Sequence, residues 1–293
     1  MFNIHTHQGS QTTETLFSVV IPSWNNLPFL QNCIRSLRLH SRVKLQIIVV
    51  ANQATDGTLP WLNEQSDIDY IYSEQNLGIC YGLNAARALI RSPYLIYLND
   101  DMYVLPGWDI GIQKAIQEIG HNHFYLSATM IEPTHTGNPC VVVANYGNGL
   151  DNFKEEELLA NYQQHRRNDW CGATWPPSVI PLQLWDLVGG LSTEFSPGMY
   201  SDPDLSKKLY EAGIRYFRGI GDSLVYHFGT RSTRRIRQNT GRKTFLRKWG
   251  ISSNYFCRQF LQLGQDFKGP LPETTISRHQ MWLHRIKRLR NSW

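Results

Sequence analysis

The stretch SPYLIYLNDDMYVLPGWD, residues 92–109, sets the first constraint on the fold, because its apolar run ends abruptly at Asn99-Asp100-Asp101. Residues 94–98 are aliphatic and aromatic and follow a proline, which predicts a buried strand. Two adjacent carboxylates at the end of such a strand repel each other and are costly to desolvate. A bound divalent cation would offset that cost. The alternative is that the two aspartates open a solvated turn before Pro106-Gly107.

The residues before this stretch alternate between apolar strands and amphipathic helices. Strands are predicted within residues 16–22, 43–52 and 67–73, and apolar residues recur at helical spacing over 30–37 and 83–90. This βαβ alternation predicts an α/β fold with a mostly parallel sheet and helices on both faces.

A polar cluster follows each of the predicted strands. The clusters are residues 23–25, 52–56, 76–78 and 99–101. In a parallel sheet the carboxyl ends of the strands meet at one edge, and ligands bind there. Four polar clusters on one edge favour a ligand site over a solvated turn.

Composition narrows the class of protein. At 41% hydrophobic and 18% charged, the 293 residues can bury a full core. No apolar run is long enough to span a bilayer. Residues 1–15 lack the features of a secretory signal and are predicted to be a disordered leader. The five scattered cysteines form no CxxC pair, which argues against a disulfide framework or a zinc site and favours a cytoplasmic protein.

Charge is distributed unevenly along the chain. Residues 223–293 hold 15 of the 29 Lys and Arg residues but only two of the 24 acidic ones, which leaves 14 basic and 22 acidic residues before them. A basic segment of this size predicts an anionic partner such as phosphate, nucleic acid or a membrane. Some of the basic residues in 231–248 could close over the phosphates of such a partner.

Near the end of the chain, four apolar residues share the spacing of one helix face: Trp282, Ile286, Leu289 and Trp293. With arginines on the other faces, this spacing predicts a helix lying on an anionic membrane, peripheral to the inner face of the plasma membrane. The alternatives are a helix that docks on the body of the protein or on a second subunit in a homodimer.

The second half of the chain has one clear helix, in MYSDPDLSKKLYEAG, residues 199–213. Asp202 is predicted as its N-cap, Pro203 as its first helical residue, and Gly213 as its end. Two strands are predicted after it, at residues 215–220 and 223–228.

Six motifs in order resemble those of a family 2 glycosyltransferase. They are SVVIPSWN, IIVVANQATDGT, NLGICYGLNAA, YLIYLNDD, GGLSTEF…MYSDPDLSKKLYEAG and VYHFGTRS. The resemblance covers about residues 17–232 and implies the GT-A fold, a Rossmann-like, mostly parallel sheet flanked by helices. The expected domain is residues 16–232, with a nucleotide-sugar half at 16–110 and an acceptor half at 111–232. A basic α-helical extension is expected at 233–293.

The resemblance implies a nucleotide-sugar donor and a divalent cofactor, Mg²⁺ or Mn²⁺, held by Asp101 with help from His227. It implies that Asp202 is the general base of an inverting transfer to a hydroxyl of a carbohydrate or lipid-linked acceptor. By analogy, the setting is bacterial surface polysaccharide or glycolipid assembly. The expected donor-binding residues are Pro22, Ser23, Trp24, Asn25, Asn52, Asp56, Asn76, Gly78, Asn84, Asn99 and Asp100.

Three positions depart from the family pattern. Asn99 replaces the first aspartate of the DXD motif, Ala51-Asn52 stands where acidic residues are usual, and Ser201 precedes Asp202 in place of a glutamate. Because one of the acidic residues usually reads the nucleotide base, the base of the donor stays open.

Several of these residues also have structural interpretations. Asp202 could serve only as the cap of its helix, and Asp204 could serve only to stabilise the positive end of that helix. His227 could be a histidine packed in the core. Asp56 first of all marks a turn. Trp175 and Trp185 could stack on a sugar ring or belong to the core.

Two other functions compete with sugar transfer. A nucleic-acid-binding protein would use the basic tail, but the carboxylate cluster would repel phosphate, so no nucleic acid is expected. A sugar nucleotidyltransferase also uses metal and carboxylates, but the first strand has no glycine-rich, lysine-bearing phosphate loop after it.

Overall fold

The computed structural model describes residues 3–10, 14–230 and 240–290. Its strands are β1 (Ile4–His7), β2 (Phe17–Ser23), β3 (Leu45–Asn52), β4 (Ile68–Ser73), β5 (Tyr94–Tyr97), β6 (Met102–Val104), β7 (Phe124–Glu132), β8 (Val142–Val143), β9 (Trp170–Cys171), β10 (Ser178–Pro181) and β11 (Tyr216–His227). Its α-helices are α1 (Leu27–His40), α2 (Thr58–Asn63), α3 (Gly78–Ala86), α4 (Trp108–Ile119), α5 (Glu155–Asn161), α6 (Leu182–Val188), α7 (Ser201–Glu211), α8 (Gly241–Trp249), α9 (Ser253–Tyr255) and α10 (Arg278–Arg290). Short helices are η1 (Arg87–Leu89), η2 (Leu150–Asn152), η3 (Tyr162–His165), η4 (Thr193–Phe195) and the π-helical η6 (Phe256–Phe260).

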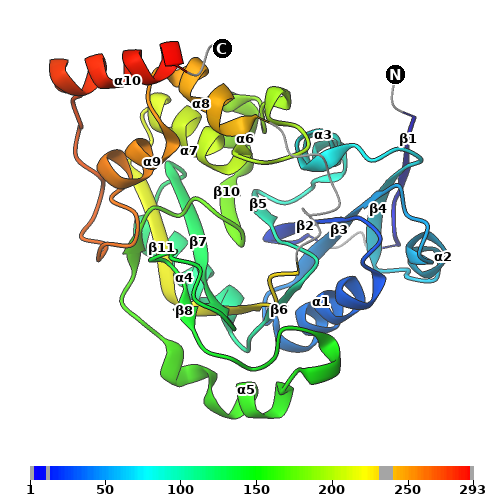
Figure 1. Ribbon diagram of the computed structural model, residues 1–293. Helices are drawn as coiled ribbons and strands as arrows, with labels where there is room; N and C mark the ends of the chain where they lie inside the picture. Colours follow the sequence, from blue (N-terminus) through cyan, green and yellow to red (C-terminus); the bar gives the residue numbers. More distant parts are fainter. Residues whose placement is uncertain (1–2, 11–13, 231–239, 291–293) are drawn as a thin grey trace.

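One sheet runs through the molecule in the order β1-β4-β3-β2-β5-β10-β7-β11-β6 (Figure 1). Strands β4, β3, β2 and β5 are parallel, as the βαβ alternation predicts. Strand β10 joins the two halves by pairing antiparallel with both β5 and β7, and β7 is parallel to β11. The predicted α/β class with a mostly parallel central sheet is confirmed.

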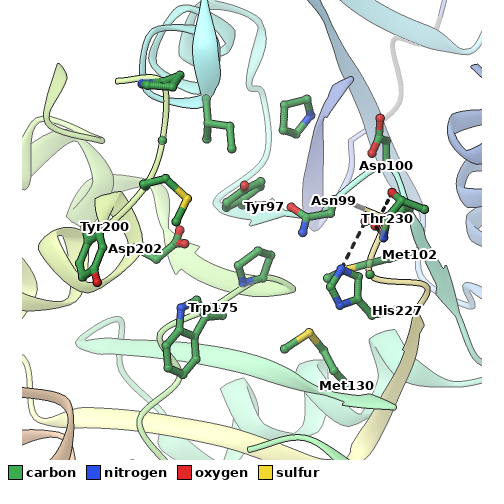
Figure 2. Close-up of a pocket in the computed structure, with 18 of the residues that line it drawn as sticks. Tyr97, Asn99, Asp100, Met102, Met130, Trp175, Tyr200, Asp202, His227 and Thr230 are labelled. Atoms are coloured by element: carbon green, nitrogen blue, oxygen red, sulfur yellow. Dashed lines mark hydrogen bonds and ion pairs between the residues drawn. The ribbon is translucent and has the colours of Figure 1, made fainter. Parts of the chain in front are cut away.

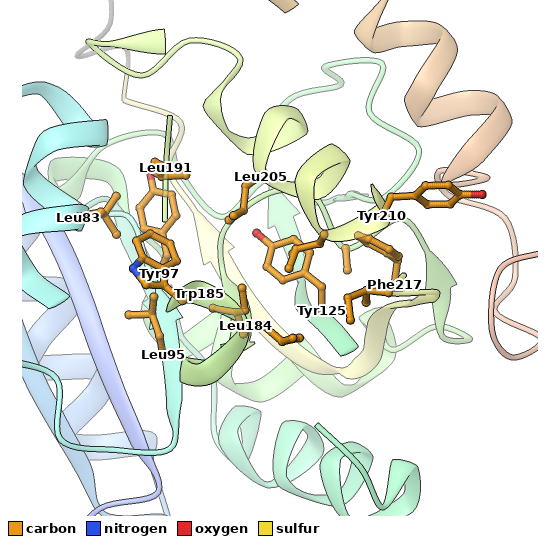
Figure 3. Close-up of a cluster of buried hydrophobic side chains, with 14 of the residues drawn as sticks. Leu83, Leu95, Tyr97, Tyr125, Leu184, Trp185, Leu191, Leu205, Tyr210 and Phe217 are labelled. Carbon is orange, nitrogen blue, oxygen red and sulfur yellow. The ribbon is translucent and has the colours of Figure 1, made fainter. Parts of the chain in front are cut away.

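Alternating side chains of the buried strands supply two hydrophobic layers. On one face, Val20, Ile48 and Val50 pack with residues of α3, α6 and α7 (Figure 3). On the other face, Val19 and Ile21 pack with residues of α1, α2 and α4. Strand residues two apart share a face, so a continuous apolar strand buries both of its sides and predicts this three-layer arrangement.

Helices from the C-terminal extension complete the first of these layers. Phe245 of α8, Phe256 and Phe260 are buried in the same cluster as Leu209 and Tyr210 of α7. The part of the extension that is described therefore packs into the core of the main domain. Among the described helices, none is long and apolar enough to cross a membrane.

Two predicted features differ in the structure. Within residues 1–15, for which disorder is predicted, Ile4–His7 forms β1, which pairs antiparallel with β4. The backbone of Gly9 also donates a 2.8 Å hydrogen bond to Asp69. The two strands predicted at 215–228 are one strand, β11, whose register shifts between Ile220 and Leu224. A bulge in a continuous strand reads as a break when only the sequence is available.

Candidate active site

A cavity of about 750 Å³ opens at the carboxyl ends of the parallel strands (Figure 2). Both halves of the sheet, α7, the loop before it, and the C-terminal extension contribute to its walls. Eleven of the fourteen predicted site residues line it: Pro22, Ser23, Trp24, Asn52, Asn76, Gly78, Asn99, Asp100, Asp101, Asp202 and His227. The fold thus brings together residues that lie up to two hundred positions apart.

Three predicted donor-binding residues are missing from the described cavity lining: Asn25, Asp56 and Asn84. Asn25 Oδ1 accepts a 2.7 Å hydrogen bond from the backbone of Thr55, and Asp56 accepts one of 2.8 Å from the backbone of Leu27 at the start of α1. The Asn84 side chain forms two hydrogen bonds with the backbone of Leu191. These side chains brace loops, because short polar side chains satisfy backbone groups as readily as they bind ligands.

Asp101 and His227 form an ion pair on the cavity wall, with 3.4 Å between Oδ1 and Nε2. The other Asp101 oxygen accepts hydrogen bonds from the backbone and hydroxyl of Thr230, at 2.7 and 2.8 Å. Nδ1 of His227 lies 2.8 Å from Glu132 Oε1. Both metal-ligand candidates are therefore fixed in orientation by a second partner.

Neighbouring charges shift the pKa values of both Asp101 and His227. Burial acts against the charged forms, but the His227 imidazolium and the Thr230 hydrogen bonds lower the pKa of Asp101. Burial likewise opposes protonation of His227, yet Asp101 and Glu132 raise its pKa to about 10. The raised pKa thus keeps His227 protonated at neutral pH, with Nε2 facing Asp101.

The donor set fits a divalent cation that is shared with a ligand. Glu132 holds Nδ1 of His227 and leaves Nε2 directed at Asp101, as in carboxylate–histidine–metal arrangements. Within the described residues, no group of three or more His, Cys, Asp or Glu side chains could hold a metal ion alone. Mg²⁺ in particular is usually bound by one or two protein ligands together with substrate phosphates and water.

Residues 76–78, with the sequence Asn-Leu-Gly, shape another part of the cavity wall. Asn52 and Asn76 accept hydrogen bonds from the backbone of Leu77 and Gly78. Gly78 has a φ of +68°, and a Cβ there would lie 2.7 Å from Cα of Pro197. Only glycine lets this segment approach the loop that leads into α7.

Asp202 lies in the first turn of α7 and faces the cavity (Figure 2). The helix begins at Ser201 after Tyr200, whose φ is +73°, so the prediction that Asp202 is the N-cap is wrong. Burial raises the pKa of Asp202 to about 7. A carboxylate with a pKa near neutrality can accept a proton and remain ionised part of the time, as a general base requires.

Asp204 ties the start of α7 to the end of α8. Its carboxylate is fully buried and accepts hydrogen bonds from Ser192 Oγ at 2.6 Å and Trp249 Nε1 at 2.7 Å. Lys248 Nζ lies 3.0 Å from Asp204 Oδ1 and 2.8 Å from Glu194. This side chain is structural, as its position in the helix predicts, and it holds the turn that carries Asp202.

The structure adds residues to the cavity that the sequence did not single out. Glu132 and Thr230 contact the predicted metal ligands, and Ser253 and Asn254 of the extension form part of the wall. The polar residue at the end of β7 is the one signal that could have identified Glu132. Of the two tryptophans, Trp175 lines the cavity, whereas Trp185 is buried in the core.

The fold matches those of solved glycosyltransferases of the GT-A class. A Staphylococcus aureus TarS fragment in complex with UDP-GlcNAc has a TM-score of 0.52 and 15% identity, over 73% of this chain and 61% of that one. GalNAc-T7 with UDP, GalNAc and Mn²⁺ has a TM-score of 0.60 and 12% identity, over 95% of this chain and 55% of that one. At these identities the similarity shows the fold alone.

Residues 18–139 match the family model described as glycosyl transferase family 2. The hyaluronan synthase of Pasteurella multocida is 23% identical over 230 residues, which cover 75% of this chain and 21% of the synthase. The Bacillus subtilis uncharacterized glycosyltransferase YfnE is 36% identical over 89 residues, 29% of this chain and 23% of that protein. The chain thus has the GT-A fold, and its residues 18–139 match glycosyl transferase family 2; it spans about a fifth of the length of these relatives.

Proposed function

We propose that this protein transfers a sugar from a nucleotide-sugar donor to an acceptor hydroxyl, with inversion and with the help of a divalent cation. One observation carries the proposal: a carboxylate with a pKa near 7, Asp202, lines the same cavity as the Asp101–His227 pair. A proton acceptor and a cation site in one cavity are what inverting transfer from a diphosphate requires.

The donor would bind at the ends of β2, β3 and β5. Asn52, Asn76 and Asn99 offer amides there, and the Ser23 hydroxyl is buried without a hydrogen-bond partner among the described residues. A buried polar group of this kind is costly unless a ligand or water satisfies it. The TarS fragment was solved with UDP-GlcNAc, which supports a nucleotide-sugar donor for this protein.

Asp101 and His227 would hold the cation, Mg²⁺ or Mn²⁺, beside the diphosphate. A divalent ion supplies charge neutralisation as the nucleoside diphosphate leaves. His227 has to give up its Nε2 proton for this role, while Glu132 keeps the ring oriented. GalNAc-T7, which shares the fold, was solved with UDP, GalNAc and Mn²⁺, which supports a divalent cation as cofactor.

Asp202 would accept the proton of the acceptor hydroxyl. As that oxygen bonds to the anomeric carbon, the bond to the diphosphate oxygen breaks, and the diphosphate departs with the electron pair. A direct displacement on the face opposite the leaving group inverts the configuration of the sugar. Asp204 holds the first turn of α7 and thereby positions Asp202.

The acceptor would enter past Asp202, between Trp175 and the extension residues Ser253 and Asn254. An aromatic face beside hydroxyl and amide groups suits a carbohydrate. The Pasteurella relatives are named hyaluronan synthase and chondroitin synthase, which supports a role in polysaccharide or glycolipid assembly. The five free, buried cysteines are consistent with a cytoplasmic location.

The test is a turnover panel with UDP-, GDP-, CMP- and dTDP-linked sugars, each with Mn²⁺ or with EDTA. We expect release of one nucleotide only with Mn²⁺, and a product whose anomeric configuration, read by proton NMR, is opposite to that of the donor. Asp202→Asn should abolish turnover, while Asp151→Asn, at an exposed position, should not. Retention of configuration, or equal turnover in EDTA, would contradict the proposal.

A further inference from the structure

Helix α10 carries large apolar side chains on its outer surface. Met281 is 41% exposed, Trp282 56% and Leu289 67%, which places three of the nine most exposed large hydrophobics of the described chain on this one helix. An apolar cluster on one element, unlike scattered exposed residues, marks an interaction surface.

The orientation of α10 is fixed by its inner face. His284 is 2% exposed, and its ring meets that of Tyr255 edge-on, with 4.8 Å between the centroids. Leu283 and Ile286 are half-buried, so within the predicted apolar face Ile286 is partly covered, whereas Trp282 and Leu289 are exposed to solvent. Trp293, which the same spacing includes, lies outside the described residues.

The outer face is also strongly basic. The helix sequence RHQMWLHRIKRLR contains no acidic residue. Arg278 and Arg285, which lie three or four residues from Trp282 or Leu289 and so share their face, are exposed. Cations beside exposed tryptophan and leucine side chains match the interfacial region of an anionic bilayer, where apolar groups enter the headgroup layer and cations meet lipid phosphates.

We propose that the outer face of α10 binds the surface of an anionic membrane. A second copy fits less well, because a two-fold contact through α10 would bring two acid-free basic faces together. The bound membrane would lie near the part of the cavity wall that contains Asn254, since Tyr255, which packs on α10, follows that residue.

The test is co-sedimentation of the full chain with phosphatidylcholine vesicles, with and without about 30% phosphatidylglycerol. We expect binding to the anionic vesicles that weakens with salt. The double variant Arg278→Glu/Arg285→Glu should lose about tenfold or more in partitioning. The matched control is Arg42→Glu/Lys44→Glu, at two exposed positions far from α10 in the sequence. It changes the net charge by the same amount and should bind like the wild type.

A second pair of variants tests the apolar side chains. Trp282→Ser/Leu289→Ser should weaken binding, whereas Leu39→Ser/Leu187→Ser, at leucines that are 58% and 68% exposed, should not. Unchanged melting temperatures would confirm that the variants fold. The proposal would be overturned if the α10 variants bind as well as their controls, or if the wild type does not bind anionic vesicles at low salt. It would also be overturned if the wild type binds no vesicles and instead forms a dimer that Trp282→Ser dissociates.

Discussion

Replacing Asp202 with asparagine should remove activity and at the same time stabilise the protein. The variant keeps the size of the side chain but cannot accept a proton, so we expect kcat to fall by about 10²–10⁴. In the wild type, kcat/KM should rise about tenfold per pH unit below the pKa of about 7 and level off above it.

The stability effect follows from the same pKa. The folded protein holds the Asp202 proton up to about pH 7, whereas the unfolded chain loses it near the usual 3.8. Stability therefore falls as the pH rises through this window, and the full cost applies above it. At about 1.4 kcal/mol per pKa unit the shift corresponds to about 4 kcal/mol, which we reduce to about 2 kcal/mol because the carboxylate is partly open to water.

Thermal unfolding of the two proteins at pH 5 and pH 8 measures this difference. Asp202→Asn should melt higher than the wild type at pH 8, by on the order of 5 °C, and the gap should narrow at pH 5. A variant that keeps a tenth or more of the wild-type kcat, or a melting difference that is the same at both pH values, would refute the reasoning.

Three further substitutions test other parts of the site. Asp204→Ala removes a fully buried carboxylate that is paired with the partly exposed Lys248 and should cost about 3–5 kcal/mol of unfolding free energy in chemical denaturation, whereas Asp186→Ala removes an exposed pair and should cost about 1 kcal/mol or less. Gly78→Ala should destabilise by about 1–3 kcal/mol, since the new Cβ would meet backbone at 2.7 Å; Gly107→Ala, with a similar φ but open space, should lose less. Trp175→Ala should raise KM for the acceptor in steady-state kinetics and leave donor KM unchanged, and an unchanged acceptor KM would argue against stacking.

Much of the sheet from β2 to β5 follows from local sequence pattern. The strand predicted at 16–22 is β2 (Phe17–Ser23), and that at 94–98 is β5 (Tyr94–Tyr97). Apolar runs between turn residues predict buried strands, and parallel pairing then brings their polar ends to one edge. The cavity at that edge was predictable because these constraints act within short segments.

Contacts between distant segments were not predictable in this way. Glu132 reaches His227 because β7 and β11 are parallel with Ile131 beside Tyr226, a register set by packing across 95 residues. The placement of Asn254 in the cavity wall likewise depends on how the extension docks on α7. Apart from the polar residue at the end of β7, the sequence carries no pattern that predicts either placement.

For short polar side chains, the sequence does not separate ligand binding from hydrogen bonding to the backbone. Asn25, Asp56 and Asn84 resemble ligand-binding residues in type and position, but they satisfy backbone groups of neighbouring loops. Asn76, in a similar position, both braces Gly78 and lines the cavity. The same side-chain chemistry serves both roles, so only the folded geometry separates them.

We propose that the cavity binds a nucleoside diphosphate together with a cation held by Asp101. Isothermal titration of the wild type with UDP, GDP, CMP and dTDP, with and without Mn²⁺, measures this directly. We predict that one nucleotide binds at least about tenfold more tightly with Mn²⁺, that Asp101→Asn removes this enhancement, and that Asp151→Asn retains it. Nucleotide binding that is equal with and without Mn²⁺, or an enhancement that persists in Asp101→Asn, would contradict the account.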